Sequence, residues 1–190
     1  MTLAYRGTMT KAATLKQLRD HAKMDQIIQG TYWTGNGEGK GCAVGCLTHD
    51  SNGGHDQFPD RWGVPENLAY LMDQIFESLP TDDAKVWPIR IMSAIKPGSD
   101  LSGVWDRWAL WMLRDLLPIA GSSTPVVADM VTLFERATHD DEPSESEWAG
   151  AAGAAGAAGA AWEARAAWAA ARHEWARRAA DEFVRLVKAA

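Results

Sequence analysis

Apolar residues recur at intervals of three and four along most of the chain, which is the spacing of a helix with one buried face. The segment between Pro65 and Pro80 has this pattern, and its two prolines suit the first turn and the end of a helix. No segment alternates apolar and polar residues as a half-buried strand does. We therefore expect an all-α, compact fold. The same spacing predicts helices over residues 10–29, 81–95, 101–117 and 124–137.

Two places interrupt this helical pattern. Pro88 lies inside the helix expected over 81–95 and predicts a kink or a break there. The segment 30–63 is rich in Gly, Asn, Asp and His, with one short apolar stretch from Cys42 to Leu47. It is expected to be mostly loop, with at most a β-hairpin and one short helix.

The C-terminal part has a pattern of its own. Ser144 and Glu147 form a capping box that predicts a helix start. Trp148, Ala155, Trp162 and Ala169 follow at seven-residue intervals, with Trp175 close to the next position. We expect a helical domain over 1–140 that carries the Gly-rich loop. A long Ala/Gly/Trp-rich helical tail over 141–190 is expected to pack on this domain or on a second copy of the chain.

Composition narrows the classes of function. Hydrophobic residues make up 46% and charged residues 23% of the chain, enough for a buried core. The net charge of −6 is the opposite of what duplex-DNA binding requires. We expect no membrane span and no export leader, hence a cytoplasmic protein whose Cys42 and Cys46 are reduced thiols.

One hypothesis for the Gly-rich segment is an anion cradle. Gly39 and Gly41 leave room for backbone amides to approach a ligand, and Lys40 supplies a positive charge. Tyr32 and Trp33 are candidates to stack on a base. The segment lacks the residues of a nucleotide-binding P-loop, so its alternative is a flexible surface loop.

Two further hypotheses use the same four side chains. Zinc accepts two thiolates and two imidazoles, and Cys42, Cys46, His49 and His55 supply them within 14 residues. Alternatively, one cysteine is a nucleophile with His49 or His55 as its base. The simplest alternative is that both cysteines only pack in the core. No cofactor is expected.

The box Gly39-Lys-Gly-Cys-Ala-Val-Gly-Cys46 resembles one in uncharacterised proteins of phages, prophages and bacteria. The resemblance covers about residues 12–115 and includes Ile75-Phe-Glu-Ser-Leu-Pro80, and an Ala/Trp-rich C-terminal helix is similar too. It implies a mobile-element setting, the host cytoplasm and, by analogy, a protein that counters host defence by sequestering a nucleotide-derived immune signal. It assigns no activity to any residue.

The leading hypothesis from the sequence is therefore a protein, not expected to be an enzyme, that binds a small phosphorylated or nucleotide-like ligand. The alternatives are a cysteine/histidine enzyme acting on a small substrate and a structural or inhibitory protein-binding module. We expect no duplex DNA or membrane as partner, and a homo-oligomer is possible. The expected ligand-binding residues are Tyr32, Trp33, Gly39, Lys40, Gly41, Cys42, His49 and His55.

Overall fold

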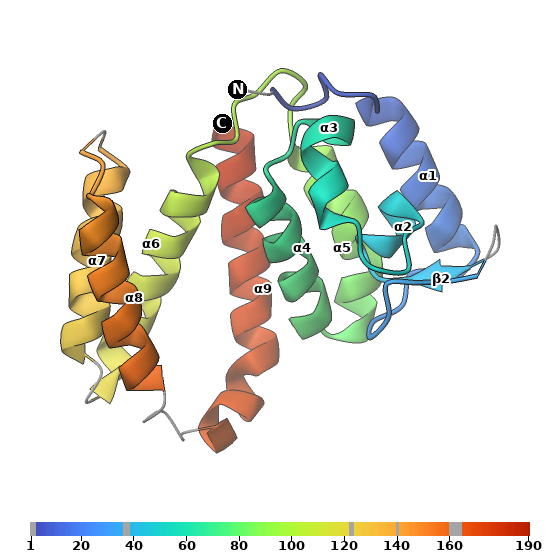
Figure 1. Ribbon diagram of the computed structural model, residues 1–190. Helices are drawn as coiled ribbons and strands as arrows, with labels where there is room; N and C mark the ends of the chain where they lie inside the picture. Colours follow the sequence, from blue (N-terminus) through green and yellow to red (C-terminus); the bar gives the residue numbers. More distant parts are fainter. Residues whose placement is uncertain (1–2, 36–38, 122–123, 140, 160–164) are drawn as a thin grey trace. The chain divides into compact units, whose positions relative to one another are not determined.

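The computed structural model of the chain is built almost entirely from helices (Figure 1). It describes residues 3–35, 39–121, 124–139, 141–159 and 165–190, and the side chains of 155–172 are not described. The all-α prediction is confirmed. The chain divides into two compact units, so the boundary expected at residue 140 falls inside the second unit. The first unit comprises Met1–Val104 with Arg172–Ala190, and the second comprises Trp105–Ala171.

Helix α1 opens the first unit and spans Lys11–Lys23. Its start is capped by Thr10, whose side chain accepts a hydrogen bond from the Ala13 amide. The helix ends earlier than the expected position near residue 29. Asp25 adopts a left-handed conformation with φ of 51°, and Ile27 then pairs with Gly41 in a parallel bridge. The apolar residues after Lys23 therefore pack from an extended segment.

Helices α4 (Glu66–Ser78) and α5 (Thr81–Ala94) form the centre of the first unit. One face of α4 is apolar and buried, as its spacing predicted. α5 is a single helix that continues through Pro88, where we expected a kink or a break. Pro88 is buried, and the indole nitrogen of the adjacent Trp87 donates to the Met72 carbonyl of α4. Packing against α4 offsets the one backbone hydrogen bond that the proline removes.

The Gly-rich segment contains a small hairpin and short helical turns. Strands β1 (Trp33–Thr34) and β2 (Lys40–Gly41) pair in antiparallel register, with Trp33 opposite Gly41. Residues 36–38, which include Gly37, lie outside the described residues. The remaining elements here are helix α2 (Gly45–Thr48), the 3₁₀ turn η1 (His55–Gln57) and helix α3 (Phe58–Trp62).

Helix α9 (Arg165–Ala189) contributes its C-terminal part to the core of the first unit. Phe183 is buried, with its ring centroid 6.2 Å from that of Trp87 on α5. Arg177 pairs with Asp83 at 2.7 Å, and Arg90 of α5 pairs with Asp181. The buried residues of this part of α9 lie on one face of the helix: Ala176, Ala179, Ala180, Phe183, Val184, Leu186 and Val187.

The second unit contains α6 (Val104–Leu116) from Trp105 onward, the turn η2 (Leu117–Ile119), α7 (Thr124–Ala137) and α8 (Glu145–Gly159). α7 and α8 pack as a pair in which Phe134 lies 4.8 Å from Trp148 between ring centroids. The Ser144 amide donates to Glu147, and the Glu147 amide donates to the Ser144 hydroxyl, so the capping box is formed. Trp162 and the side chains of Ala155 and Ala169 lie outside the described residues. None of the helices in the described ranges is long and apolar enough to cross a bilayer.

Candidate metal and ligand site

The glycines of the Gly39–Cys46 box allow two pieces of backbone to lie in direct contact. A Cβ at Gly41 would lie 1.9 Å from the Tyr32 carbonyl oxygen, and one at Gly45 would lie 1.5 Å from the same atom. The amide of Gly41 donates to Gln26, and its carbonyl accepts from Ile28. These two glycines therefore serve close packing. They do not form an open loop around a ligand.

This packing buries the side chain of Cys42. The Cys42 amide donates to the Thr31 carbonyl at 2.7 Å, and its side chain is 1% exposed. Its Sγ accepts from the Gly45 amide at 3.4 Å. Burial, followed by the charge of Asp73, raises the pKa of the Cys42 thiol well above its ordinary value. The thiol is therefore protonated at neutral pH, and proton removal needs a strong external driving force.

Two carboxylates of α4 approach this thiol. Asp73 and Glu77 are four residues apart, so both lie on one face of the helix. One potential ligand atom each from Cys42, Asp73 and Glu77 lie within 4.8 Å of one another. Both carboxylate oxygens of Glu77 accept a hydrogen bond from the Gly30 amide, at 2.9 and 3.2 Å. This contact fixes the orientation of the Glu77 side chain.

Asp73 has its two oxygens in different environments. Oδ2 lies 3.3 Å from Nε2 of His55. Oδ1 is buried and accepts no N–H or O–H hydrogen bond from the described residues, and the Asp73 side chain is 13% exposed. A buried carboxylate oxygen without a partner is unfavourable by about 1–3 kcal/mol or more. The nearby Cys42 thiol offers only a weak S–H donor, so the site favours a cation beside this oxygen.

Two exposed tyrosines surround the buried imidazole of His55. Tyr70 stacks on it with centroids 4.0 Å apart, and Tyr32 meets it edge-on at 5.7 Å. Tyr32 is 39% and Tyr70 48% exposed, which is unusual for large aromatic side chains. Burial raises the pKa of Tyr32, and the negative charge of Asp73 raises it further. Tyr32 therefore stands in a negative field that favours a cation over a free anion.

His49 belongs to a different cluster. Its ring stacks on Trp33 at 4.4 Å between centroids, and its Nε2 lies 2.9 Å from Nε2 of His21. Nδ1 of His21 lies 2.6 Å from Oε1 of Gln26, an oxygen that can only accept. Nδ1 of His21 therefore donates to Gln26, and the contact between the two Nε2 atoms is a hydrogen bond when one of them carries a proton and the other does not. Trp33 is buried in this cluster, so its ring is not open to stack on a base.

The second cysteine, Cys46, lies outside the group formed by Cys42, Asp73 and Glu77. Cys46 is fully buried and its Sγ donates to the Gly41 carbonyl at 3.3 Å. Burial raises the pKa of its thiol to about 12. The expected set of two cysteines and two histidines is thus divided: Cys42 and His55 each lie beside Asp73, while Cys46 and His49 lie elsewhere. Within the described ranges, Cys42, Asp73 and Glu77 are the group whose atoms converge on one point.

Asp73 and Glu77 were not among the expected site residues, because they lie outside the Gly-rich segment and more than thirty residues after Cys42. The available signal was an acidic pair at i and i+4 on an amphipathic helix. Acidic pairs on helices are common on solvated faces, so this signal does not indicate a site without the fold. Comparison with family models, with curated proteins and with solved structures found no match for this chain.

Proposed function

We propose that the protein binds a divalent metal ion of the zinc type with Cys42, Asp73 and Glu77, and binds a small ligand through that ion. The observation that carries the proposal is the convergence of three ligand atoms, one each from Cys42, Asp73 and Glu77, within 4.8 Å of one another. The buried Oδ1 of Asp73 accepts no N–H or O–H hydrogen bond from the described residues, and the Cys42 thiol offers this carboxylate only a weak S–H donor. A cation at this point would satisfy that oxygen and neutralise the two carboxylates.

The donor set suits zinc. Zinc accepts thiolate at about 2.3 Å and carboxylate oxygen at about 2.0–2.2 Å in a tetrahedral arrangement. Such bonds separate neighbouring ligand atoms by about 3.5 Å, so small side-chain rotations close the present group around an ion. Metal binding would release the Cys42 proton, and the attraction of the ion offsets the burial that keeps this thiol protonated.

The surroundings of the three residues resemble the outer shell of a metal site. Gly45 donates to the Cys42 sulfur, His55 lies on the second oxygen of Asp73, and Gly30 donates to Glu77. Each contact orients one ligand while leaving it at least one lone pair. Such partners raise metal affinity because they fix ligand geometry before the ion arrives.

Three protein ligands leave a fourth position of a tetrahedral ion for a water or a ligand. We propose that a small anionic ligand with a planar group, such as a nucleotide derivative, takes this position. Its phosphate or carboxylate would bind the ion, and its planar group would stack on the exposed ring of Tyr32 or Tyr70. If the metal ion binds first and the anionic ligand second, the positive charge of the metal offsets the two carboxylates before the anion arrives. An anion can then bind beside Asp73 and Glu77.

The enzyme alternative with a cysteine nucleophile has weaker support. A nucleophilic cysteine needs a thiolate in an electropositive, partly exposed setting. Cys42 is 1% exposed and lies beside Asp73, and the pKa of its thiol is raised. Both features oppose attack on a substrate by the thiol.

The test is zinc titration of the metal-free chain by calorimetry. We expect one site, and each of Cys42→Ser, Asp73→Asn and Glu77→Gln should weaken zinc affinity by about 10–100-fold or more. Cys46→Ser is the matched control, because it removes a buried thiol four residues away and should leave zinc affinity unchanged. Equal losses in Cys46→Ser and Cys42→Ser, or no zinc binding by the folded chain, would contradict the proposal.

A second experiment tests whether a small ligand binds through the metal ion. A panel of nucleotides should raise the melting temperature of the zinc-loaded protein and leave that of the Asp73→Asn variant unchanged, because a ligand that binds only the folded state stabilises it. A shift of equal size without zinc would place the ligand elsewhere on the protein.

A further inference from the structure

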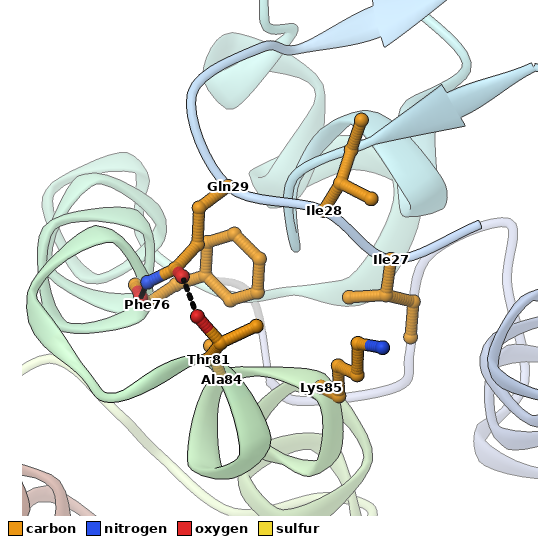
Figure 2. Close-up of a pocket in the computed structure, with 7 residues that line it drawn as sticks. All are labelled: Ile27, Ile28, Gln29, Phe76, Thr81, Ala84 and Lys85. Carbon is orange, nitrogen blue, oxygen red and sulfur yellow. Dashed lines mark hydrogen bonds between the residues drawn. The ribbon is translucent and has the colours of Figure 1, made fainter. Parts of the chain in front are cut away.

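A separate cavity lies between the segment after α1 and the first turns of α5. Its volume is about 270 Å³, and Figure 2 shows the residues of both segments that line it, together with Phe76 of α4. At about 30 Å³ for each water, this space equals roughly nine waters. The lining residues are Ile27, Ile28, Gln29, Phe76, Thr81, Ala84 and Lys85.

Most of the lining is apolar, and most of its polar groups already have partners. The Gln29 amide nitrogen donates to the carbonyls of Phe76 and Leu79, and its oxygen accepts from the Thr81 hydroxyl (Figure 2). A ligand therefore gains little from Gln29 and Thr81. Its main gain is contact with the apolar walls.

Lys85 is the charged residue of the lining. Its ammonium group pairs with Asp25 at 2.7 Å, and the two side chains are 43% and 70% exposed. An ion pair this exposed contributes little to stability, so an anionic ligand can take over the ammonium group at little cost. Lys40 adds positive charge nearby, since its charge acts on the same Asp25 carboxylate.

Helix α5 adds to this preference. The cavity borders its first turns, and its N-cap residue, Pro80, provides no side-chain hydrogen bond to the helix amides. The positive end of the helix dipole therefore faces this region. Asp82 and Asp83 of the same turn oppose it, but Asp83 is paired with Arg177 at 2.7 Å.

We propose that this cavity is a second ligand site, for a small amphipathic anion with one carboxylate or phosphate group and a compact apolar body. The apolar part would occupy the space beside Ile27, Phe76 and Ala84, and the anionic group would pair with Lys85. None of the proposed metal ligands lines this cavity. The inference is therefore independent of the metal proposal.

The experiment measures binding of hexanoate, hexyl phosphate and neutral 1-hexanol to the full-length chain by NMR titration. Both anions should bind, and hexanol should bind at least tenfold more weakly than the tighter anion. The comparison of hexanoate with hexyl phosphate identifies the preferred anionic group. Lys85→Met should weaken anion binding at least tenfold while leaving hexanol binding unchanged.

Two further variants separate the cavity from general effects. Ala84→Leu should abolish binding of all three probes because the added side chain fills the space, and its folding is checked by circular dichroism. Lys16→Met is the matched control, since Lys16 also forms an exposed ion pair, with Asp20 at 2.7 Å. Equal binding of hexanol and the anions, an unchanged affinity in Lys85→Met, or equal losses in Lys16→Met would overturn the proposal.

Discussion

At the residue scale, Gly41 separates two interpretations of the glycine box. An anion cradle predicts an exposed Gly41 whose replacement affects ligand binding and hardly affects folding. In the structure, Gly41 is buried and a Cβ there would meet the Tyr32 carbonyl oxygen at 1.9 Å. That oxygen belongs to backbone that accepts from the Cys42 amide, so it cannot move freely.

We therefore predict that Gly41→Val lowers the free energy of unfolding by about 1–3 kcal/mol or more, the range for overpacked interiors. Urea unfolding of the variant and the wild type measures this change in the free energy of unfolding. Gly150→Ala is the control, because nothing lies within 4 Å of the added methyl group in α8 and alanine is about 1 kcal/mol better in a helix. A Gly41→Val protein as stable as the wild type would restore the open-loop interpretation.

His49 gives a pH prediction. Burial, followed by the charges of His21 and Arg61, holds the pKa of His49 below its ordinary value. The unfolded chain then binds the proton more readily than the folded chain. This contribution to stability is fully present above about pH 6.5, the unfolded pKa, and is lost as pH falls below it.

We expect an NMR titration to give a His49 pKa below that of an unfolded-chain histidine. Between pH 7.5 and 5, the loss of unfolding free energy should be smaller in His49→Gln than in the wild type. An equal loss in both proteins would show that another group carries the pH dependence.

At the scale of elements, helical spacing located α4 and α7 within about a residue of their observed ends, but it did not locate the end of α1. The apolar residues Ile27 and Ile28 fit a helical continuation equally well. Their extended conformation depends on pairing with Gly41, a contact fourteen residues away that local spacing does not encode. Pro88 shows the same limit, because packing of α5 determines whether the helix tolerates it.

At the scale of the whole molecule, the last helix completes a core whose first buried residue is Ala4. Phe183 is 2% exposed and packs near Trp87, and Ala176, Ala179 and Ala180 of α9 are also buried. The C-terminal residues therefore pack on their own domain. Self-association through the tail stays a prediction, as do the nucleotide-derived ligand and the phage setting.

We predict that Phe183→Ala lowers the free energy of unfolding by about 3–5 kcal/mol, the usual cost of truncating a buried phenylalanine. Arg185→Ala, two residues along on the exposed side of the same helix, should change it by less than about 0.5 kcal/mol. Urea unfolding of the two variants measures the difference. A small effect at Phe183 would mean that α9 does not contribute to the core.

The sequence by itself determined the helical class and the capping box at Ser144, because periodicity and caps are local properties of the chain. Only the tertiary structure decided which side chains share a site. It brought Asp73 and Glu77 of α4 to Cys42 and sent Cys46 and His49 to other surroundings. The physical reason is that a binding site depends on distances between atoms of different elements, and those distances are fixed by packing between elements rather than by spacing within one.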